Sequence, residues 1–205
     1  MIRHIYGERL EDHIDEYDVI LVGTNLYCSM GQGLQLKLML DYPYCFEKNL
    51  ETKYGDVEKL GTIVEAENEG EPTICLCFVT KGYNFRPDLQ KDYLEYEALE
   101  QCLRLFSAKY KGKKLKIASP LIGNSKFDGN GDESKISEIF ERSVHPSLDF
   151  TVYHYEQESR SEQMKAWYEK EKQMKRKDGG KYYGMVQERK RKAEERYKKN
   201  GHRRY

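Results

Sequence analysis

A glycine loop between a predicted buried strand and a predicted helix places the strongest constraint on the fold of this chain. Residues 19–22 are consecutive apolar side chains, typical of a strand buried on both faces, and the leucine-rich residues 34–40 are interpreted as a helix. Gly31 and Gly33 lie between them. A helix that starts at such a loop exposes backbone N–H groups that can hold a phosphate or a pyrophosphate. Glycine in a strand–helix turn also serves geometry alone, so both interpretations stay open at this point.

A second segment of the same kind follows later in the chain. Residues 115–123 predict a strand that ends in glycine, and residues 133–142 predict a helix with apolar side chains on one face. The loop between them, residues 124–132, is rich in Gly, Asn and Asp. Two glycine loops at the carboxyl ends of strands form a crevice of the kind in which α/β sheets bind nucleotides. The pair therefore favours a phosphate-binding role.

The remaining pattern predicts strands and helices that mostly alternate. It predicts strands at 2–6, 61–65, 73–80 and 150–155, a helical turn within 8–17, and a long amphipathic helix at 88–110. Strands 61–65 and 73–80 bracket a turn-like segment, so we expect them to pair as a hairpin. The sequence therefore predicts an α/β fold with three layers, α/β/α, around a mixed central sheet.

A set of short motifs, in order along the chain, is similar to one known family. They are Gly7-Glu8, Gly23-Thr24-Asn25, Ser29-Met30-Gly31-Gln32-Gly33-Leu34, Tyr42-Pro43, Leu60-Gly61, Ser119-Pro120-Leu121-Ile122-Gly123 and Phe150-Thr151-Val152-Tyr153. Residues 1–155 resemble a macro domain, the ADP-ribose-binding module of the Appr-1″-p processing family. The chain is most similar to the branch with the terminal ADP-ribose protein glycohydrolase, the DNA ADP-ribosyl glycohydrolase antitoxins and the yeast-type ADP-ribose-1″-phosphate phosphatase. Its first loop departs from the common Gly-Gly-Gly-Val-Ala form.

The resemblance implies a set of ligand-binding residues. Asn25 is expected to contact the distal ribose, and Glu8 to accept a hydrogen bond from the adenine amino group. Phe127 is expected to stack on a ribose or on adenine, and Tyr155 to cover the adenine, although core packing is the alternative for such aromatic residues. The backbone N–H groups expected to hold the two phosphates belong to Met30, Gly31, Gln32, Gly33 and Leu34 in the first loop, and to Gly123, Asn124, Ser125, Lys126 and Phe127 in the second.

The resemblance also implies a pair of catalytic residues. Lys81 follows the predicted strand 73–80 and matches the catalytic lysine of the terminal ADP-ribose glycohydrolase; an amine there attacks C1″ of the ribose if partial burial lowers its pKa. Asp128 matches the partner acid, with Asp132 as the alternative because the second loop is one residue longer than in the family. The competing interpretations are a solvent-facing lysine at a strand end and an ordinary Asp-Gly turn.

Four functions are compatible with these residues. The first is a hydrolase that removes terminal ADP-ribose from a modified protein or nucleic acid, and the second is a reader that binds ADP-ribose without turnover. A third is a macro fold used as a scaffold, with the C-terminal tail as the functional part. The fourth, an ADP-ribose-1″-phosphate phosphatase, is less well supported because neither glycine loop contains a histidine.

The last fifty residues differ in composition from the rest. Residues 156–205 contain 17 Lys or Arg and 9 Asp or Glu, a net charge of +8, and this leaves residues 1–155 with a net charge of −8. The tail has too few aliphatic residues for a core of its own, but segments 163–177 and 186–200 are rich in helix-forming residues. We expect a charged, helical or partly disordered tail. It is either solvated or a contact arm for nucleic acid or protein, and the acidic body is expected to repel DNA elsewhere.

Cysteine usage and the start of the chain favour a reducing, cytoplasmic compartment. The five cysteines are odd in number, and Cys75 and Cys77 alternate along an apolar strand, as core residues do. No spacing of Cys and His is typical of zinc, so we expect neither a metal nor a cofactor. There is no signal-peptide pattern and no apolar run long enough to span a membrane. We expect a monomer with no membrane partner.

Overall fold

The computed structural model describes residues 2–82, 93–125 and 129–154, together with Lys172, Glu188 and Arg191. The chain divides into two units, Met1–Glu156 and Gln157–Tyr205. The strands and helices given below all belong to the first unit. The helices predicted within the tail lie outside the described residues, apart from three isolated positions.

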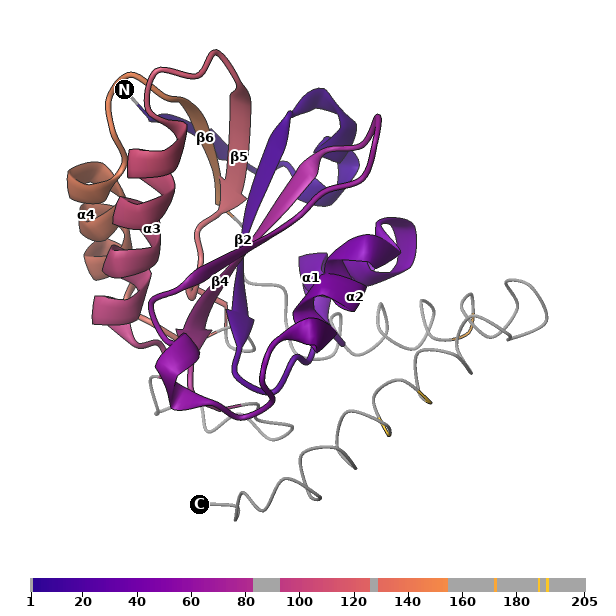
Figure 1. Ribbon diagram of the computed structural model, residues 1–205. Coiled ribbons are helices and arrows are strands. Elements are labelled where there is room, and N and C mark those ends of the chain that lie inside the picture. Colours follow the sequence, from indigo (N-terminus) through magenta and orange to yellow (C-terminus); the bar gives the residue numbers. More distant parts are fainter. Residues whose placement is uncertain are drawn as a thin grey trace. The chain divides into compact units, whose positions relative to one another are not determined.

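Six strands form one mixed sheet, in the order β1-β6-β5-β2-β4-β3 (Figure 1). All neighbouring strands are parallel except β3 and β4, which pair antiparallel as the predicted hairpin. The mixed sheet predicted from the sequence is therefore confirmed. The strands are β1 Arg3–Tyr6, β2 Val19–Asn25, β3 Ile63–Ala66, β4 Thr73–Thr80, β5 Lys116–Pro120 and β6 Asp149–His154.

Helices cover both faces of the sheet and complete the three layers. Helices α1 Gly33–Asp41 and α2 Pro43–Glu51 lie on one face, and α3 Tyr96–Tyr110 and α4 Glu133–Ser143 lie on the other (Figure 1). Helix α2 is not among the elements expected from the sequence, although Pro43 at its first turn is typical of a helix start. The predicted helical turn within 8–17 consists of two short 3₁₀ turns, Leu10–Asp12 and Ile14–Glu16, and a third spans Val57–Lys59.

Burial on both faces explains the continuous apolar runs of the central strands. Every residue of β2 is buried, as expected for a parallel strand with helices above and below it. On the α3 side, Cys75 and Cys77 are fully buried in one cluster with Cys102. The prediction that Cys75 and Cys77 are core residues is thus confirmed. All five cysteines are free and buried.

The long helix predicted for residues 88–110 begins later than expected: residues 93–95, which the structure describes, are not helical. Residues 88–92 lie outside the described residues, and helix α3 begins only at Tyr96. Leu94 instead pairs with Thr80 as an isolated antiparallel bridge, and the Glu95 N–H donates to the Val79 carbonyl at 2.9 Å. Tertiary hydrogen bonds with strand β4 therefore hold the backbone extended where the side-chain spacing alone favours a helix.

Candidate functional site

The predicted phosphate loops follow adjacent strands whose helices lie on opposite faces. Strand β2 leads through residues 26–32 to α1, and its neighbour β5 leads through residues 121–132 to α4. Strands β2 and β5 are parallel, so both loops lie at the same edge of the sheet. This divergence of the helices is the switch point at which open α/β sheets bind ligands. The arrangement inferred from the two glycine loops is therefore present.

The Asn25 side chain shapes the first loop. Its Oδ1 accepts hydrogen bonds from the backbone N–H groups of Tyr27 at 3.0 Å and Ser29 at 3.3 Å. Its Nδ2 donates to the Ser29 carbonyl at 3.0 Å, and the residue is 6% exposed. The family resemblance implies a ribose contact for Asn25, whereas these bonds give it a role in fixing the backbone that precedes α1.

The start of α1 faces open space. Among the residues that the structure describes, a Cβ added at Gly33 would meet no atom within 4 Å, and Gly33 has a φ of +50°. The residue before it, Gln32, makes no side-chain hydrogen bond to the helix start. The Met30 side chain is fully buried and Leu34 is 7% exposed, so these two residues can offer a ligand only their backbone. The partial positive charge of a helix N-terminus is therefore accessible to an anion here.

A buried lysine that the sequence did not single out supports the same loop from beneath. The Lys59 ammonium donates to the Leu26 carbonyl at 2.9 Å and to Thr52 Oγ1 at 3.0 Å. It also lies 4.6 Å from the centre of the Phe78 ring, and the residue is 9% exposed. Burial lowers the pKa of Lys59 from its ordinary value. Lys59 therefore places a cationic group beneath the loop and ties it to α2.

Packing accounts for the glycines of the second loop. Gly123 has a φ of +86°, and a Cβ there would lie 2.6 Å from a Leu94 methyl group. A Cβ at Gly131 would lie 2.9 Å from Leu94, and the Gly129 carbonyl accepts the N–H groups of Tyr93 and Leu94. The Leu94 side chain thus occupies the space where Cβ atoms of these residues would lie. It joins this loop to the segment before α3.

We predict that Gly123→Ala destabilises the fold far more than Gly112→Ala. Gly112 has a similar φ of +81°, but a Cβ there would meet no atom within 4 Å. Both variants incur the cost of a left-handed alanine, about 1–2 kcal/mol, and only Gly123→Ala adds overpacking against Leu94, about 1–3 kcal/mol. Urea unfolding of both variants measures the difference. Equal losses of unfolding free energy would show that Leu94 yields without cost.

The proposed catalytic lysine lies at the end of β4 in an ion pair. Lys81 Nζ lies 2.9 Å from Glu95 Oε1, and the Lys81 side chain is 58% exposed. The partial burial that the sequence interpretation required is therefore not observed. Asp128 lies outside the described residues. The alternative acid, Asp132, caps α4 by accepting the Lys135 N–H at 3.0 Å, which gives its carboxylate a structural role.

Glu8 follows β1 at the same edge of the sheet and contacts a histidine. Glu8 Oε2 lies 3.1 Å from His13 Nε2, and Glu16 Oε1 lies 2.7 Å from His13 Nδ1. The His13 ring stacks on Tyr153, with ring centres 5.9 Å apart. A carboxylate beside a stacked aromatic pair suits recognition of a flat base with an amino group. His13 and Tyr153 carry no motif that would have identified them in the sequence.

We predict a raised pKa for His13. The hydrogen bond that His13 donates to Glu16 is the main cause, and the charge of Glu8 adds a smaller part. The protonated ring is the form that both carboxylates hold, so these contacts weaken as the pH rises through the raised pKa. NMR titration should give a His13 pKa above its ordinary value, lowered more by Glu16→Gln than by Glu8→Gln. The reverse order would assign the main effect to Glu8.

Several predicted ligand-binding residues cannot be placed. Lys126, Phe127 and Tyr155 lie outside the described residues, whereas Gly123, Asn124 and Ser125 follow β5 at the expected edge. In the described part of the chain, no group of three or more His, Cys, Asp or Glu side chains is arranged to hold a metal ion. The described helices are also too short or too polar to cross a membrane.

Comparison with known proteins identifies the fold. No family model and no curated protein matches the sequence. A protein of unknown function from Bacteroides thetaiotaomicron is similar, with a TM-score of 0.61 and 19% identity over 76% of this chain and 98% of that chain. The macrodomain of Mycobacterium tuberculosis DarG has a TM-score of 0.58 and 19% identity, covering 76% of this chain and 99% of that chain.

A third solved structure contains a ligand. Thermosipho africanus DarTG in complex with ADP-ribose has a TM-score of 0.53 and 17% identity, over 68% of this chain and 38% of that chain. Identities this low are evidence for the fold alone. Together with the mixed six-stranded sheet and its helices on both faces, they show that this chain has the macrodomain fold.

Proposed function

We propose that the edge of the sheet formed by the ends of β1, β5, β2 and β4 binds ADP-ribose. The observation that carries this proposal is the open start of α1 at Gly33, beside the second glycine loop and in a fold that has been solved with ADP-ribose in DarTG from Thermosipho africanus. A pyrophosphate at the start of α1 would accept backbone N–H groups and gain from the helix dipole.

The order of the strands supports an extended ligand with a base at one end and a ribose at the other. Glu8, His13 and Tyr153 lie near the ends of β1 and β6, whereas Lys81 follows β4. Neighbouring strands are about 4.8 Å apart, so β1 and β4 are separated by roughly 19 Å. Adenine near Glu8, the phosphates at the two loops and the distal ribose near Lys81 would then fit along this edge.

We further propose that the protein hydrolyses terminal ADP-ribose from a modified protein or nucleic acid. Glu95 would take a proton from the Lys81 ammonium, and the free amine would attack C1″ and displace the linked carboxylate or base. The proton lost from the new C1″–N bond would pass to the ring oxygen, so the ribose opens and leaves an imine at C1″. Water would then add to the imine carbon and expel the Lys81 amine, which Glu95 reprotonates. The 2.9 Å contact between Lys81 and Glu95 supports this role for Glu95.

A reader without turnover is the second candidate function. The observation in its favour is the exposure of Lys81, because a solvated ammonium in an ion pair is a poor nucleophile. Two measurements distinguish the candidates. Isothermal titration with ADP-ribose tests binding, and release of ADP-ribose from ester-linked and base-linked substrates tests turnover. Binding without release would favour the reader, and absence of both would exclude either function.

A further inference from the structure

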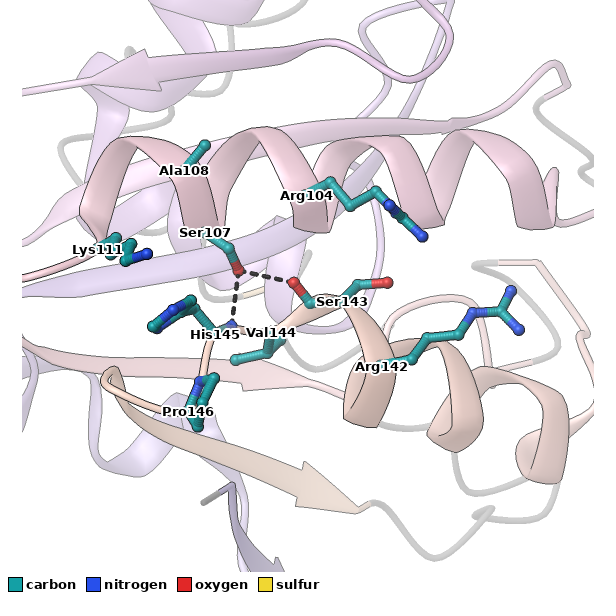
Figure 2. A pocket seen from close by; sticks show the side chains of 9 residues that line it. All are labelled: Arg104, Ser107, Ala108, Lys111, Arg142, Ser143, Val144, His145 and Pro146. Atoms are coloured by element: carbon teal, nitrogen blue, oxygen red, sulfur yellow. Dashed lines mark hydrogen bonds between the residues drawn. The ribbon is translucent and has the colours of Figure 1, made fainter.

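A pocket of about 380 Å³ lies between the C-terminal parts of α3 and α4 (Figure 2). Its polar lining consists of Arg104, Ser107, Lys111, Arg142, Ser143 and His145. Figure 2 shows the two guanidinium groups towards one end and Lys111 towards the other. Strand β4 leads into α3, which returns along the sheet, so the end of α3 lies at the amino ends of the parallel strands. The pocket is therefore remote from the candidate ADP-ribose site.

The pocket carries more positive than negative charge. Glu100 Oε1 accepts hydrogen bonds from Arg104 at 3.1 Å and 2.7 Å, and Glu100 Oε2 accepts one from Arg142 at 2.6 Å. These bonds lower the pKa of Glu100, so its carboxylate stays ionised. One carboxylate cannot neutralise two guanidinium groups and the Lys111 ammonium. Each guanidinium also has more N–H donors than these contacts use, and such donors match phosphate oxygens well.

Two serines lie between the helices at the pocket: Ser107 is hydrogen-bonded, and the hydroxyl of Ser143 has no partner among the described residues. Ser107 Oγ donates to the Ser143 carbonyl at 2.9 Å and accepts the His145 N–H at 3.1 Å, so it joins the two helices (Figure 2). Ser143 is 7% exposed, and its own Oγ makes no hydrogen bond to any residue that the structure describes. A buried hydroxyl without a partner is costly and uncommon. The Ser143 hydroxyl is also shielded from solvent, so it belongs to the α3–α4 contact and not to the ligand-accessible lining.

A run of lysines extends the positive surface beyond the pocket. Lys111, Lys113 and Lys114 are exposed and follow one another around the turn after α3, and Lys116 begins β5. Residues 1–155 have a net charge of −8, so this concentration of cations contrasts with the rest of the body. Evenly repeated cations beside an anion pocket match a ligand with repeated phosphates better than one with a single phosphate.

We propose that the α3–α4 pocket and the adjoining lysines bind the phosphodiester backbone of a nucleic acid. Arg104 and Arg142 hold one phosphate beside the pocket, and Lys111, Lys113 and Lys114 contact the following ones. This site is independent of the proposed ADP-ribose site, and it places a nucleic-acid contact on the body as well as on the basic tail.

The test uses the full chain and a short, labelled single-stranded DNA. The pocket variant is Lys111→Gln with Arg142→Gln, and the control is Lys37→Gln with Lys48→Gln. The control removes the same charge from exposed, ion-paired lysines of α1 and α2. Each phosphate contact contributes about 0.7 to the slope of log K against log salt. Lys111→Gln removes one contact and Arg142→Gln weakens the one shared with Arg104, so the pocket variant should lose about 0.7–1.4 from this slope. The control should keep the slope of the unmodified chain.

Amide chemical shifts separate the pocket from the tail. Titration with the DNA should move the amide signals of Ser107, Ser143 and His145 in the unmodified chain, and less so in the pocket variant. Unmoved signals, or equal slopes for both variants, would overturn the proposal. Shifts with inorganic phosphate but not with DNA would instead indicate a small phosphorylated ligand. Tighter binding of polyglutamate than of DNA would indicate an acidic protein partner, and would also overturn it.

Discussion

Gly33→Glu should abolish measurable binding of ADP-ribose while the fold is retained. The new carboxylate would lie at the start of α1, in the open space where we place the phosphates, and would repel them. Hydrogen bonds to charged groups contribute about 1.5–3 kcal/mol each. Losing two of them would weaken affinity by about 10²–10⁴. Isothermal titration measures this loss, and a melting curve checks the fold.

Gly70→Glu is the matched control for this variant. Gly70 has a φ of +77°, and a Cβ there would likewise meet no atom within 4 Å. It lies in the turn between β3 and β4, away from α1, so both variants incur the same backbone strain but only one places charge at the proposed site. Similar affinities in the two variants would place the ligand elsewhere.

Lys81→Ala should lose turnover while keeping most of its affinity for ADP-ribose. The phosphates and the adenine are held by other elements in our proposal, so removing the amine affects the reaction at C1″ more than binding. A positioned acid or base contributes about 10²–10⁴ to a rate, so we expect a fall in kcat of at least this order. Borohydride should trap ADP-ribose on Lys81 in the unmodified chain, as expected for an imine intermediate.

Two further variants test whether the loss of turnover is specific to Lys81 and to its ion pair with Glu95. Lys53→Ala removes another exposed lysine in an ion pair, here with Asp56, and should leave turnover unchanged. Glu95→Gln retains the side-chain shape but not the base, so turnover should fall. Full activity in Lys81→Ala would transfer the chemistry to another group, whereas binding without turnover in the unmodified chain would assign the protein to the readers.

The sequence determined the architecture because its main signals are local. The apolar runs of β2 and β4 are buried on both faces, and the apolar spacing of α4 marks one face of that helix. Gly31, Gly33 and Gly123 marked the two loops, since glycine is common where a strand turns into a helix at a ligand site. The strand–loop–helix order therefore sufficed to predict the fold and the edge of the sheet at which the loops meet.

Only the tertiary structure decided what the individual side chains do. Helix α3 starts at Tyr96 because the backbone of residues 93–95 pairs with β4 and with Gly129, which are distant in sequence. Asn25 fixes its loop, and Lys59 is buried beneath that loop through contacts with three separate segments. Such roles depend on which segments the fold brings together and on how far each side chain is shielded from water. Neither the contacts between distant segments nor the burial of a side chain is encoded in the spacing of residues along the chain.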